Sequence, residues 1–353
     1  MRRSMRWCLL LLVACTSSMP RQSIDGLMRD YSGNVPGATV LVVREGQVVF
    51  RQSYGMANLE ERVASTSDTH YRLASLTKQF TAAAILTLAE RGRLSLDDPI
   101  TRFLPELSVA QTLLSVPAQA GVPVPHITIR HLLTHTSGLY DYEDLIPPGA
   151  TKQLKDIDVL HLLEAQRSTY FPPGSRYRYS NSGYVLLALV VERASGQRFA
   201  DFLRQSIFEP IGMKSSVAFE EGISSVPNRA YGYSREGSGW RRTDQSITSA
   251  TLGDGGIYTS VDDLVFWLRA LDSGRFDAAI QPQVATDEPH VHYGFGWYVG
   301  SGAFWHHGET MGFRNFVIRF PDQHLAVVVL TNRNEGTPRE MALAIADLIL
   351  SEG

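Results

Sequence analysis

The chain is rich in β-forming residues at both ends and shows helical periodicity between them. Residues 37–55 form two β-rich runs around Glu45-Gly46, which predicts a hairpin. Four short β-rich runs separated by turn residues lie near the other end, at 293–299, 302–306, 313–320 and 325–331. An N-terminal hairpin that pairs with a C-terminal meander would form one antiparallel sheet. The pattern therefore predicts an α/β fold of the α+β kind, with helices flanking an antiparallel sheet.

The middle of the chain carries apolar residues at helical spacing. The predicted helices are 75–91, which Gly92 ends, 156–166, 184–196 and 199–208, and a final amphipathic helix is expected over 338–351. We predict one domain over residues 16–353, with a sheet portion at about 22–75 and 272–353. A mostly α-helical portion over about 76–271 would pack beside the sheet. Active sites often lie at such a seam.

The first fifteen residues have the pattern of a signal peptide. Three arginines precede an apolar stretch that is too short to span a bilayer as a helix. The stretch ends in Leu12-Val13-Ala14-Cys15, which resembles a bacterial lipobox and predicts lipidation of Cys15. Cleavage near Ala14 by an ordinary signal peptidase and an uncleaved anchor are the alternatives. We expect an exported protein of the periplasm or cell surface, held at the outer membrane by its lipid alone.

Composition narrows the chemistry that the exported body can carry out. The net charge is −3, with no long basic run, so no electrostatic case for nucleic-acid binding exists. Both cysteines, Cys8 and Cys15, lie in the targeting segment. The rest of the chain therefore has no thiolate nucleophile, disulfide or cysteine-based metal site.

Ser75-Leu76-Thr77-Lys78 is the first of three short motifs that carry chemistry. If a helix begins near Ser75, Lys78 lies one turn further on the same face. A serine hydroxyl needs a neighbouring base to become a good nucleophile, and a lysine can be that base if burial lowers its pKa. The helix N-terminus also offers a backbone N–H for a developing oxyanion. In isolation, the same residues would fit an N-cap serine and an exposed lysine.

The second and third motifs are Tyr179-Ser180-Asn181 and His306-His307-Gly308-Glu309. A phenol can relay protons, and an amide can bind a substrate carbonyl or hold the lysine. A late strand that lines a cleft can aim a backbone N–H at the oxyanion, and glycine allows a close approach there. His292-Tyr293-Gly294 has the same spacing as the third motif, but we favour the later one because a second glycine and an aromatic strand follow it.

In this order, the motifs resemble the serine β-lactamase-like superfamily of class C β-lactamases, D-alanyl-D-alanine carboxypeptidases, D-aminopeptidases and related esterases. Its pattern is Ser-x-x-Lys, Tyr-x-Asn and Lys/His-x-Gly, and the similarity runs from about Val35 to Thr331. Segments 131–139, 171–184, 208–213, 255–260 and 293–297 also resemble recurring segments of that superfamily. No Gly-x-Ser-x-Gly elbow occurs, which disfavours an unrelated α/β-hydrolase.

The resemblance implies a role for each matching residue. Ser75 would be the nucleophile, Lys78 its proton partner, and Tyr179 the base in acylation and the activator of water in deacylation. Asn181 would contact the substrate, and His306, Gly308 and Glu309 would line the substrate-binding site. The backbone N–H groups of Ser75 and Glu309 would form the oxyanion hole. We expect no cofactor or metal.

His306 departs from dedicated β-lactamases, which carry lysine at this position. A neutral imidazole lacks the permanent cation that would bind a β-lactam carboxylate, and Glu309 adds negative charge. We therefore expect cleavage of small ester or peptide substrates, including D-amino-acid and cell-wall peptides. A β-lactamase or D-alanyl-D-alanine carboxypeptidase is the alternative within the enzymes, and a non-catalytic sensor of cell-wall fragments is the alternative outside them. Segments 108–126 and 141–155 are expected to shape the pocket.

His131 and His135 stand four residues apart, a spacing that metals favour on a helix. No adjacent glutamate accompanies them, and they lie in a segment that binds no metal in the resembling family. We predict a structural role for both.

Overall fold

The computed structural model describes residues 19–108 and 126–351. The predicted signal peptide with Cys15, and most of segment 108–126, lie outside the described residues. Within the described ranges, no helix has both the length and the apolar composition needed to cross a membrane.

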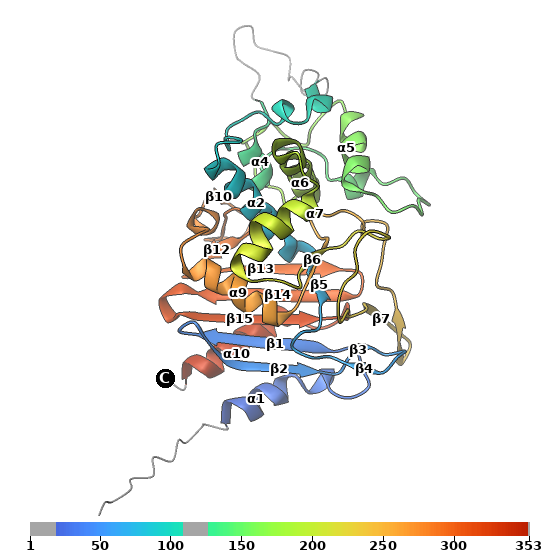
Figure 1. The fold of residues 1–353 in the computed structure, drawn as a ribbon, viewed down its shortest axis with the longest axis vertical. Helices are drawn as coiled ribbons and strands as arrows, with labels where there is room; N and C mark the ends of the chain where they lie inside the picture. Colours follow the sequence, from blue (N-terminus) through green and yellow to red (C-terminus); the bar gives the residue numbers. More distant parts are fainter. Residues whose placement is uncertain (1–18, 109–125, 352–353) are drawn as a thin grey trace, which may run out of the picture.

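The centre of the fold is an eight-stranded antiparallel sheet in the order β10-β11-β12-β13-β14-β15-β1-β2 (Figure 1). The predicted hairpin is present as β1 (Ala38–Arg44) and β2 (Gln47–Tyr54), joined through Glu45 and Gly46. Strand β1 also pairs with β15, from Ala38 opposite Thr331 to Arg44 opposite Leu325. The N-terminal hairpin and the C-terminal meander therefore share one sheet, which confirms the predicted fold class. The remaining strands of this sheet are β10 (Val284–Ala285), β11 (His292–Tyr293), β12 (Tyr298–Gly300), β13 (Ala303–Thr310), β14 (Phe313–Phe320) and β15 (Leu325–Thr331).

Both faces of the central strands are buried. Because successive side chains point to opposite faces of a strand, Val40 and Val42 pack into one apolar cluster and Leu41 and Val43 into another. Helices α1 (Met19–Leu27) and α10 (Pro338–Ser351) cover the first face, and α10 has the bounds predicted for it. Helix α9 (Val261–Asp272) packs against β1 and β15 on the second face.

A helical part adjoins the β13 side of the sheet (Figure 1). Helix α2 (Lys78–Glu90) is its core and is buried on nearly all sides, polar residues included. Helix α6 (Asn181–Ser195) packs on α2 and ends at Gly196, which adopts the left-handed conformation. The other helices here are α4 (Ile129–Leu133), α5 (Asp156–Glu164), α7 (Phe199–Phe202) and α8 (Glu209–Ile211), with a π-helical stretch over Leu203–Phe208 between α7 and α8.

Short 3-10 helices link these elements: η1 (Arg29–Tyr31), η2 (Ala74–Thr77), η3 (Ile100–Arg102), η4 (Pro105–Leu107), η5 (Tyr142–Leu145), η7 (Asp277–Ile280) and η8 (Pro321–Gln323).

Segment 212–260, which the structure describes in full, has no helix, although we expected a mostly helical middle. It contributes β6 (Val217–Ala218), β7 (Tyr233–Glu236), β8 (Gly239–Arg242) and β9 (Ile257–Thr259), and β5 (Tyr71–Arg72) pairs with β9. Strands β3 (Met56–Asn58) and β4 (Val63–Ala64) form a further small sheet.

Among the boundaries that differ from the sequence-based prediction, two lie next to the start of α2. The α-helix begins at Lys78, not Ser75, because the four residues before it form η2. The first residue of η2, Ala74, has a φ of 50°. The predicted strand 293–299 is interrupted by a turn in which Gly296 has a φ of 80°. A Cβ on Gly296 would press against the backbone of Lys78, so the close approach of this turn to α2 requires glycine.

Candidate active site

Ser75 lies in η2, between β5 and α2, and its side chain is half-buried. The Asn315 side chain on β14 holds the entry to this turn, because its Nδ2 donates to the carbonyl oxygens of Arg72 at 2.8 Å and Leu73 at 3.3 Å. Strand β13 packs on the other side of the turn, where a Cβ on Gly308 would collide with the Leu73 carbonyl. The nucleophile predicted from the sequence is therefore presented by a turn that two strands of the sheet fix in place.

Lys78 is completely buried and directs its ammonium group at Ser75. Its Nζ donates to Ser75 Oγ at 3.1 Å, to Asn181 Oδ1 at 2.7 Å and to the Asp254 carbonyl oxygen at 3.2 Å. Burial lowers the pKa of Lys78 to about 8, and the nearby charges of Asp254, Asp141 and Glu143 only partly oppose this effect. A lysine with this pKa has an appreciable neutral fraction near pH 7 and can accept a proton from Ser75.

Asn181 connects the lysine to two carboxylates that the sequence analysis did not identify as site residues. Its backbone N–H donates to Asp141 Oδ2 at 2.7 Å, and its Nδ2 donates to Glu143 Oε1 at 3.1 Å. Partial loss of hydration and the neighbouring charge of Asp254 raise the pKa of both carboxyl groups. Glu143 is exposed, so this edge of the site presents a carboxylate to solvent. Only the position of these two acids in the sequence could have indicated a role in the site. They directly follow segment 131–139, which resembles the family, and lie in segment 141–155, which was expected to shape the pocket.

Tyr179 lies beside Lys78, with Lys78 Nζ 4.9 Å from the centre of the phenol ring. The hydroxyl is buried and has no hydrogen-bond partner within 3.5 Å among the described residues. Burial raises the pKa of Tyr179 above its ordinary value, and an interaction with the Ser75 side chain opposes this only in part. Asp254, Asp141 and Glu143 raise the pKa further. The phenol is therefore protonated at neutral pH and can donate or relay a proton.

His135 supports Tyr179 from behind. Its ring is 4.3 Å from the Tyr179 ring, centre to centre, and its Nδ1 accepts the backbone N–H of Ser180 at 3.1 Å. Burial and the charge of Lys78 hold the pKa of His135 well below its ordinary value. His131 Nδ1 accepts the backbone N–H of Thr128 at the start of α4. Both imidazoles thus hydrogen-bond to the backbone, and their structural role stays a prediction. Among the described residues no group of three or more side chains that could hold a metal ion is found.

The third motif lies wholly on β13, which extends to Thr310, beyond the predicted end at His306. His306 is fully buried, its Nε2 lies 3.0 Å from the Tyr293 hydroxyl, and its ring is 6.1 Å from that of Tyr179. Burial keeps the pKa of His306 well below its ordinary value, so the imidazole is neutral. Tyr293 belongs to the His292-Tyr293-Gly294 segment with the same spacing, which therefore supports the preferred motif from β11, two strands away in the sheet.

The structure thus joins Ser75, Lys78 and Asn181 by direct hydrogen bonds and packs Tyr179 against Lys78. His306 is buried, and its ring lies among those of Tyr179, Tyr293 and Tyr298. Glu309 is exposed at the end of β13 and lies 3.8 Å from Arg314. The roles given to these residues in catalysis and substrate binding stay predictions, as do those of the Ser75 and Glu309 backbone N–H groups.

A serine next to a buried, deprotonable lysine, on a sheet with an adjoining helical part, is the arrangement expected of a serine hydrolase. Comparison with protein families matches residues 21–351 to the beta-lactamase family. The chain belongs to the beta-lactamase family and is a serine hydrolase.

Relatives and solved structures agree with this assignment. Penicillin-binding protein 4* of Bacillus subtilis strain 168 is 31% identical over 330 residues, which cover 86% of this chain and 70% of the relative. A D-aminopeptidase of Gluconobacter oxydans is 30% identical over 313 residues, which cover 84% of this chain but only 56% of that protein. The structure of the octameric penicillin-binding protein homologue from Pyrococcus abyssi superimposes with a TM-score of 0.78 at 26% identity, over 95% of this chain and 77% of that one.

Proposed function

We propose that the protein hydrolyses ester or peptide bonds, including those of D-amino acids, through an acyl-Ser75 intermediate. The observation that carries this proposal is the 3.1 Å contact between Ser75 Oγ and the Nζ of a fully buried Lys78. A buried amine with a pKa of about 8 is suited to general-base chemistry near neutral pH.

In acylation, Ser75 Oγ attacks the substrate carbonyl while its proton passes to the neutral amine of Lys78. The Tyr179 phenol, protonated in the resting site, donates its proton to the leaving group and regains one from Lys78. Water then attacks the acyl-serine carbonyl and loses a proton to the neutral Lys78 amine. As the bond between the acyl carbon and Ser75 Oγ breaks, Lys78 returns this proton to Ser75 Oγ, which releases the acid product and restores the resting site. This order assigns the resting base to Lys78 rather than Tyr179, because burial moves the two pKa values in opposite senses.

The carboxylates beside Asn181 favour substrates that carry an amino group. Glu143 is exposed and tethered to the amide that holds Lys78, so its charge lies near the reacting serine. The similarity to a D-aminopeptidase supports the same preference. The neutral His306 offers no cation for a β-lactam carboxylate, which supports ester or peptide hydrolysis over β-lactam hydrolysis.

The test is a substrate panel on the wild-type protein and Ser75→Ala: p-nitrophenyl acetate and butyrate, D-alanyl p-nitroanilide, a D-alanyl-D-alanine peptide and nitrocefin. We expect ester or D-alanyl cleavage by the wild type and none by a folded Ser75→Ala. Full activity in Ser75→Ala would refute the acyl-serine proposal. A wild type that binds cell-wall fragments but neither turns over substrate nor is labelled by a fluorophosphonate would favour the non-catalytic sensor.

The amino-group preference is tested separately with Glu143→Gln. We expect kcat/KM for D-alanyl p-nitroanilide to fall about tenfold, while the value for p-nitrophenyl butyrate, which has no amino group, changes less than twofold. Asp144→Asn is the matched control, because Asp144 lies on the same turn but accepts a hydrogen bond from Tyr170 instead. Equal losses on both substrates would show that Glu143 acts on the site as a whole and not on the amine.

We also propose that the protein is exported and lipid-anchored through Cys15. The support is the lipobox-like Leu12-Val13-Ala14-Cys15 after a short apolar stretch. Expression in a Gram-negative host with a radiolabelled fatty acid should label the wild type and leave Cys15→Ala unlabelled. Recovery of unlabelled wild-type protein from the periplasm would contradict the anchor and leave export in place.

A further inference from the structure

Loop 249–256, between the helical part and β9, supplies one of the three acceptors around Lys78. The acceptor is the carbonyl oxygen of Asp254, 3.2 Å from Lys78 Nζ. The adjacent Gly253 carbonyl accepts the Thr81 hydroxyl of α2 at 2.7 Å. Gly253 also presses on α6 so closely that a Cβ there would collide with the Tyr184 carbonyl. The orientation of these peptide groups therefore sets how Lys78 is held.

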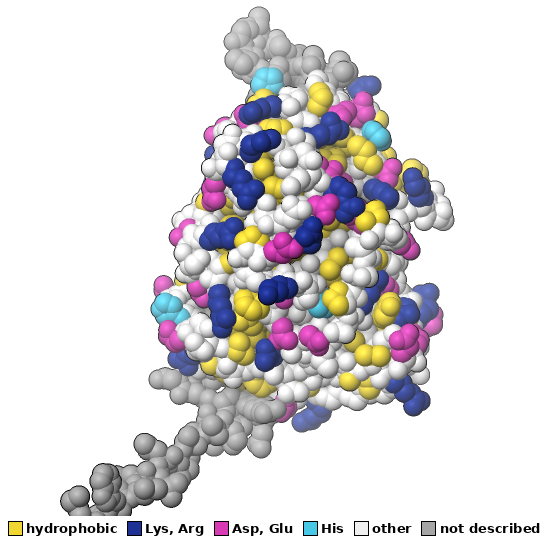
Figure 2. All heavy atoms as spheres, viewed as in Figure 1, with side chains coloured by type: hydrophobic (Ala, Val, Ile, Leu, Met, Phe, Trp, Pro, Cys, Tyr) yellow, Lys and Arg dark blue, Asp and Glu magenta, His cyan; other side chains and the backbone are white. Residues whose placement is uncertain are grey.

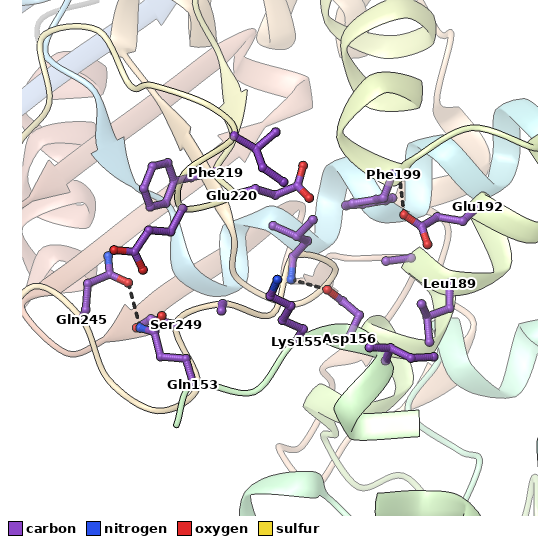
Figure 3. A pocket seen from close by; sticks show the side chains of 16 residues that line it. Gln153, Lys155, Asp156, Leu189, Glu192, Phe199, Phe219, Glu220, Gln245 and Ser249 are labelled. Atoms are coloured by element: carbon purple, nitrogen blue, oxygen red, sulfur yellow. Dashed lines mark hydrogen bonds between the residues drawn. The ribbon is translucent and has the colours of Figure 1, made fainter. Parts of the chain in front are cut away.

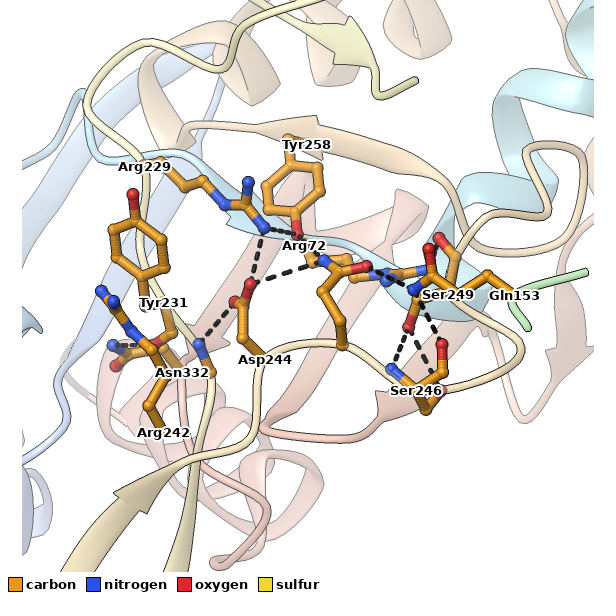
Figure 4. Close-up of polar contacts among 12 residues, drawn as sticks. Arg72, Gln153, Arg229, Tyr231, Arg242, Asp244, Ser246, Ser249, Tyr258 and Asn332 are labelled. Atoms are coloured by element: carbon orange, nitrogen blue, oxygen red, sulfur yellow. Dashed lines mark hydrogen bonds and ion pairs between the residues drawn. The ribbon is translucent and has the colours of Figure 1, made fainter. Parts of the chain in front are cut away.

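Arg72 fixes the two ends of this loop from the side of the nucleophile. Its Nη2 donates to the Ser249 carbonyl at 2.9 Å and its Nε donates to the Gly255 carbonyl at 3.2 Å, and the neighbouring contacts are drawn in Figure 4. Arg72 leaves the backbone N–H groups in the middle of the loop to other partners.

Those middle N–H groups are bound by Asp156, the first residue of α5. Its Oδ2 accepts the Leu252 N–H at 3.0 Å and its Oδ1 accepts the Gly253 N–H at 3.2 Å. The carboxylate is 8% exposed and lines a cavity of about 350 Å³ between Lys155 and Leu189 (Figure 3). A carboxylate with one oxygen on each of two consecutive N–H groups fixes the rotation of the peptides that carry them.

We propose that Asp156 is a positioning residue for the reaction: it holds peptides 252–254 so that the Asp254 carbonyl meets Lys78 Nζ. This inference rests on the proposed function, in which Lys78 is the base. The Asp156 carboxylate binds the N–H groups of Leu252 and Gly253, and the carbonyl of the following residue, Asp254, accepts the hydrogen bond from Lys78 Nζ. In the described part of the chain, Arg72 and Tyr142 also make two hydrogen bonds each to this loop, but Asp156 is the residue whose carboxylate accepts from two consecutive backbone N–H groups.

An amide in place of this carboxylate would lose one of the two bonds. Asparagine has one acceptor oxygen, so its NH₂ group would face the second N–H, and the loop would rotate to relieve the conflict. Lys78 would then lose the Asp254 carbonyl, an acceptor that favours its charged form. Two effects follow: slower acylation, because the amine is misplaced, and a lower pKa for Lys78.

The test compares Asp156→Asn with Asp158→Asn, a matched control in the same first turn of α5. Asp158 accepts the Lys155 backbone N–H at 2.9 Å and caps the helix without touching the loop. The measurement is the rate of Ser75 labelling by a fluorophosphonate from pH 6 to 10. For Asp156→Asn we expect the high-pH plateau to fall at least tenfold and the pH midpoint to move down by about half a unit or more. For Asp158→Asn we expect a plateau within twofold of wild type and an unmoved midpoint.

If Asp156 had a merely structural role, its replacement would lower the melting temperature. The pH midpoint of Ser75 labelling, measured on the protein that remains folded, would not move. Labelling within twofold of wild type with an unmoved midpoint would overturn the inference. Burial raises the pKa of Asp156 itself to about 7. The hydrogen bonds from the two N–H groups lower this pKa, and the charges of Asp254 and Glu192 raise it. Plateaus are therefore compared above pH 8.5, where the wild-type side chain is a carboxylate.

If Asp156→Asn does not fold, Thr81→Val provides the second variant, since it removes the hydroxyl that holds the Gly253 carbonyl. We expect a plateau three- to tenfold lower and a midpoint that moves in the same direction, and an unchanged profile would overturn the inference. Failure of the proposed function is distinguishable, because wild-type protein would then not be labelled at Ser75 at all.

Discussion

The pH dependence of acylation follows directly from the environment of Lys78. Burial lowers the pKa of this side chain from 10.5 to about 8, so the amine is about 9% neutral at pH 7. A lysine with the ordinary value of 10.5 would be about 0.03% neutral at the same pH. The site thus raises the concentration of the free base about 300-fold, which corresponds to about 3.4 kcal/mol.

Acylation should follow the neutral fraction of Lys78. We expect the labelling rate of Ser75 to rise about ninefold from pH 6 to 7, a further tenfold from pH 7 to 9, and then to level. Lys78→Arg keeps a cation beside Ser75 but cannot deprotonate in this range, so the rate should fall about 100-fold or more and the pH dependence should disappear.

The assay is the stopped reaction of the full chain with a fluorophosphonate, quantified by intact-protein mass, with Ser75→Ala as the blank for hydroxide-driven reaction. A rate that is flat from pH 6 to 9 would refute the argument that Lys78 is the titrating base. A rate that keeps rising beyond pH 10 would show that the base has a pKa far above 8, as expected of Tyr179.

Three further outcomes follow from the geometry. Gly308→Ala should lower kcat/KM for the ester at least tenfold, because the new Cβ collides with the Leu73 carbonyl two residues before Ser75. Gly239→Ala on β8 is the control: a Cβ there meets only a distant carbonyl, so this variant should match wild type in the same steady-state assay. His135→Leu should cost about 1–3 kcal/mol in urea unfolding, since it removes the acceptor for the Ser180 N–H. It should also reduce kcat, because the aromatic ring behind Tyr179 is lost, and a loss of stability without a loss of kcat would contradict this second part. Because burial lowers the pKa of His306, ¹⁵N NMR should show a neutral imidazole at pH 6.5, where an ordinary histidine is half protonated. Nitrocefin turnover should be slower than ester hydrolysis, and turnover equal to or faster than that of the ester would show that the neutral imidazole does not disfavour β-lactams.

The strands and the last helix could be predicted because each has a regular pattern that local physics enforces. Strand β15 and helix α10 have the predicted bounds, and the hairpin is built around Glu45 and Gly46 as expected. The start of α2 could not be predicted in the same way. Ala74 has a positive φ, and η2 is held by Asn315 from a distant strand, so tertiary contacts override the helical periodicity there.

The motifs predicted which side chains meet around Ser75, but not what lies around them. Asp141 and Glu143 bond to Asn181 across about forty residues of chain, a separation that no local spacing reveals. His306 was expected to line the substrate site, and the sequence did not indicate that its side chain is buried against Tyr293, a residue of the competing motif. Burial and partner identity depend on how the sheet and the helical part meet, which single-sequence patterns do not encode.

Trapping the nucleophile is the most direct measurement. The full chain is treated with a fluorophosphonate at pH 8.5, weighed intact, and digested to locate the adduct. One phosphonyl group per chain, on the peptide that contains Ser75, and no adduct on Ser75→Ala are the expected results. An unmodified wild type, or an adduct on another residue with hydrolysis intact in Ser75→Ala, would contradict the central claim.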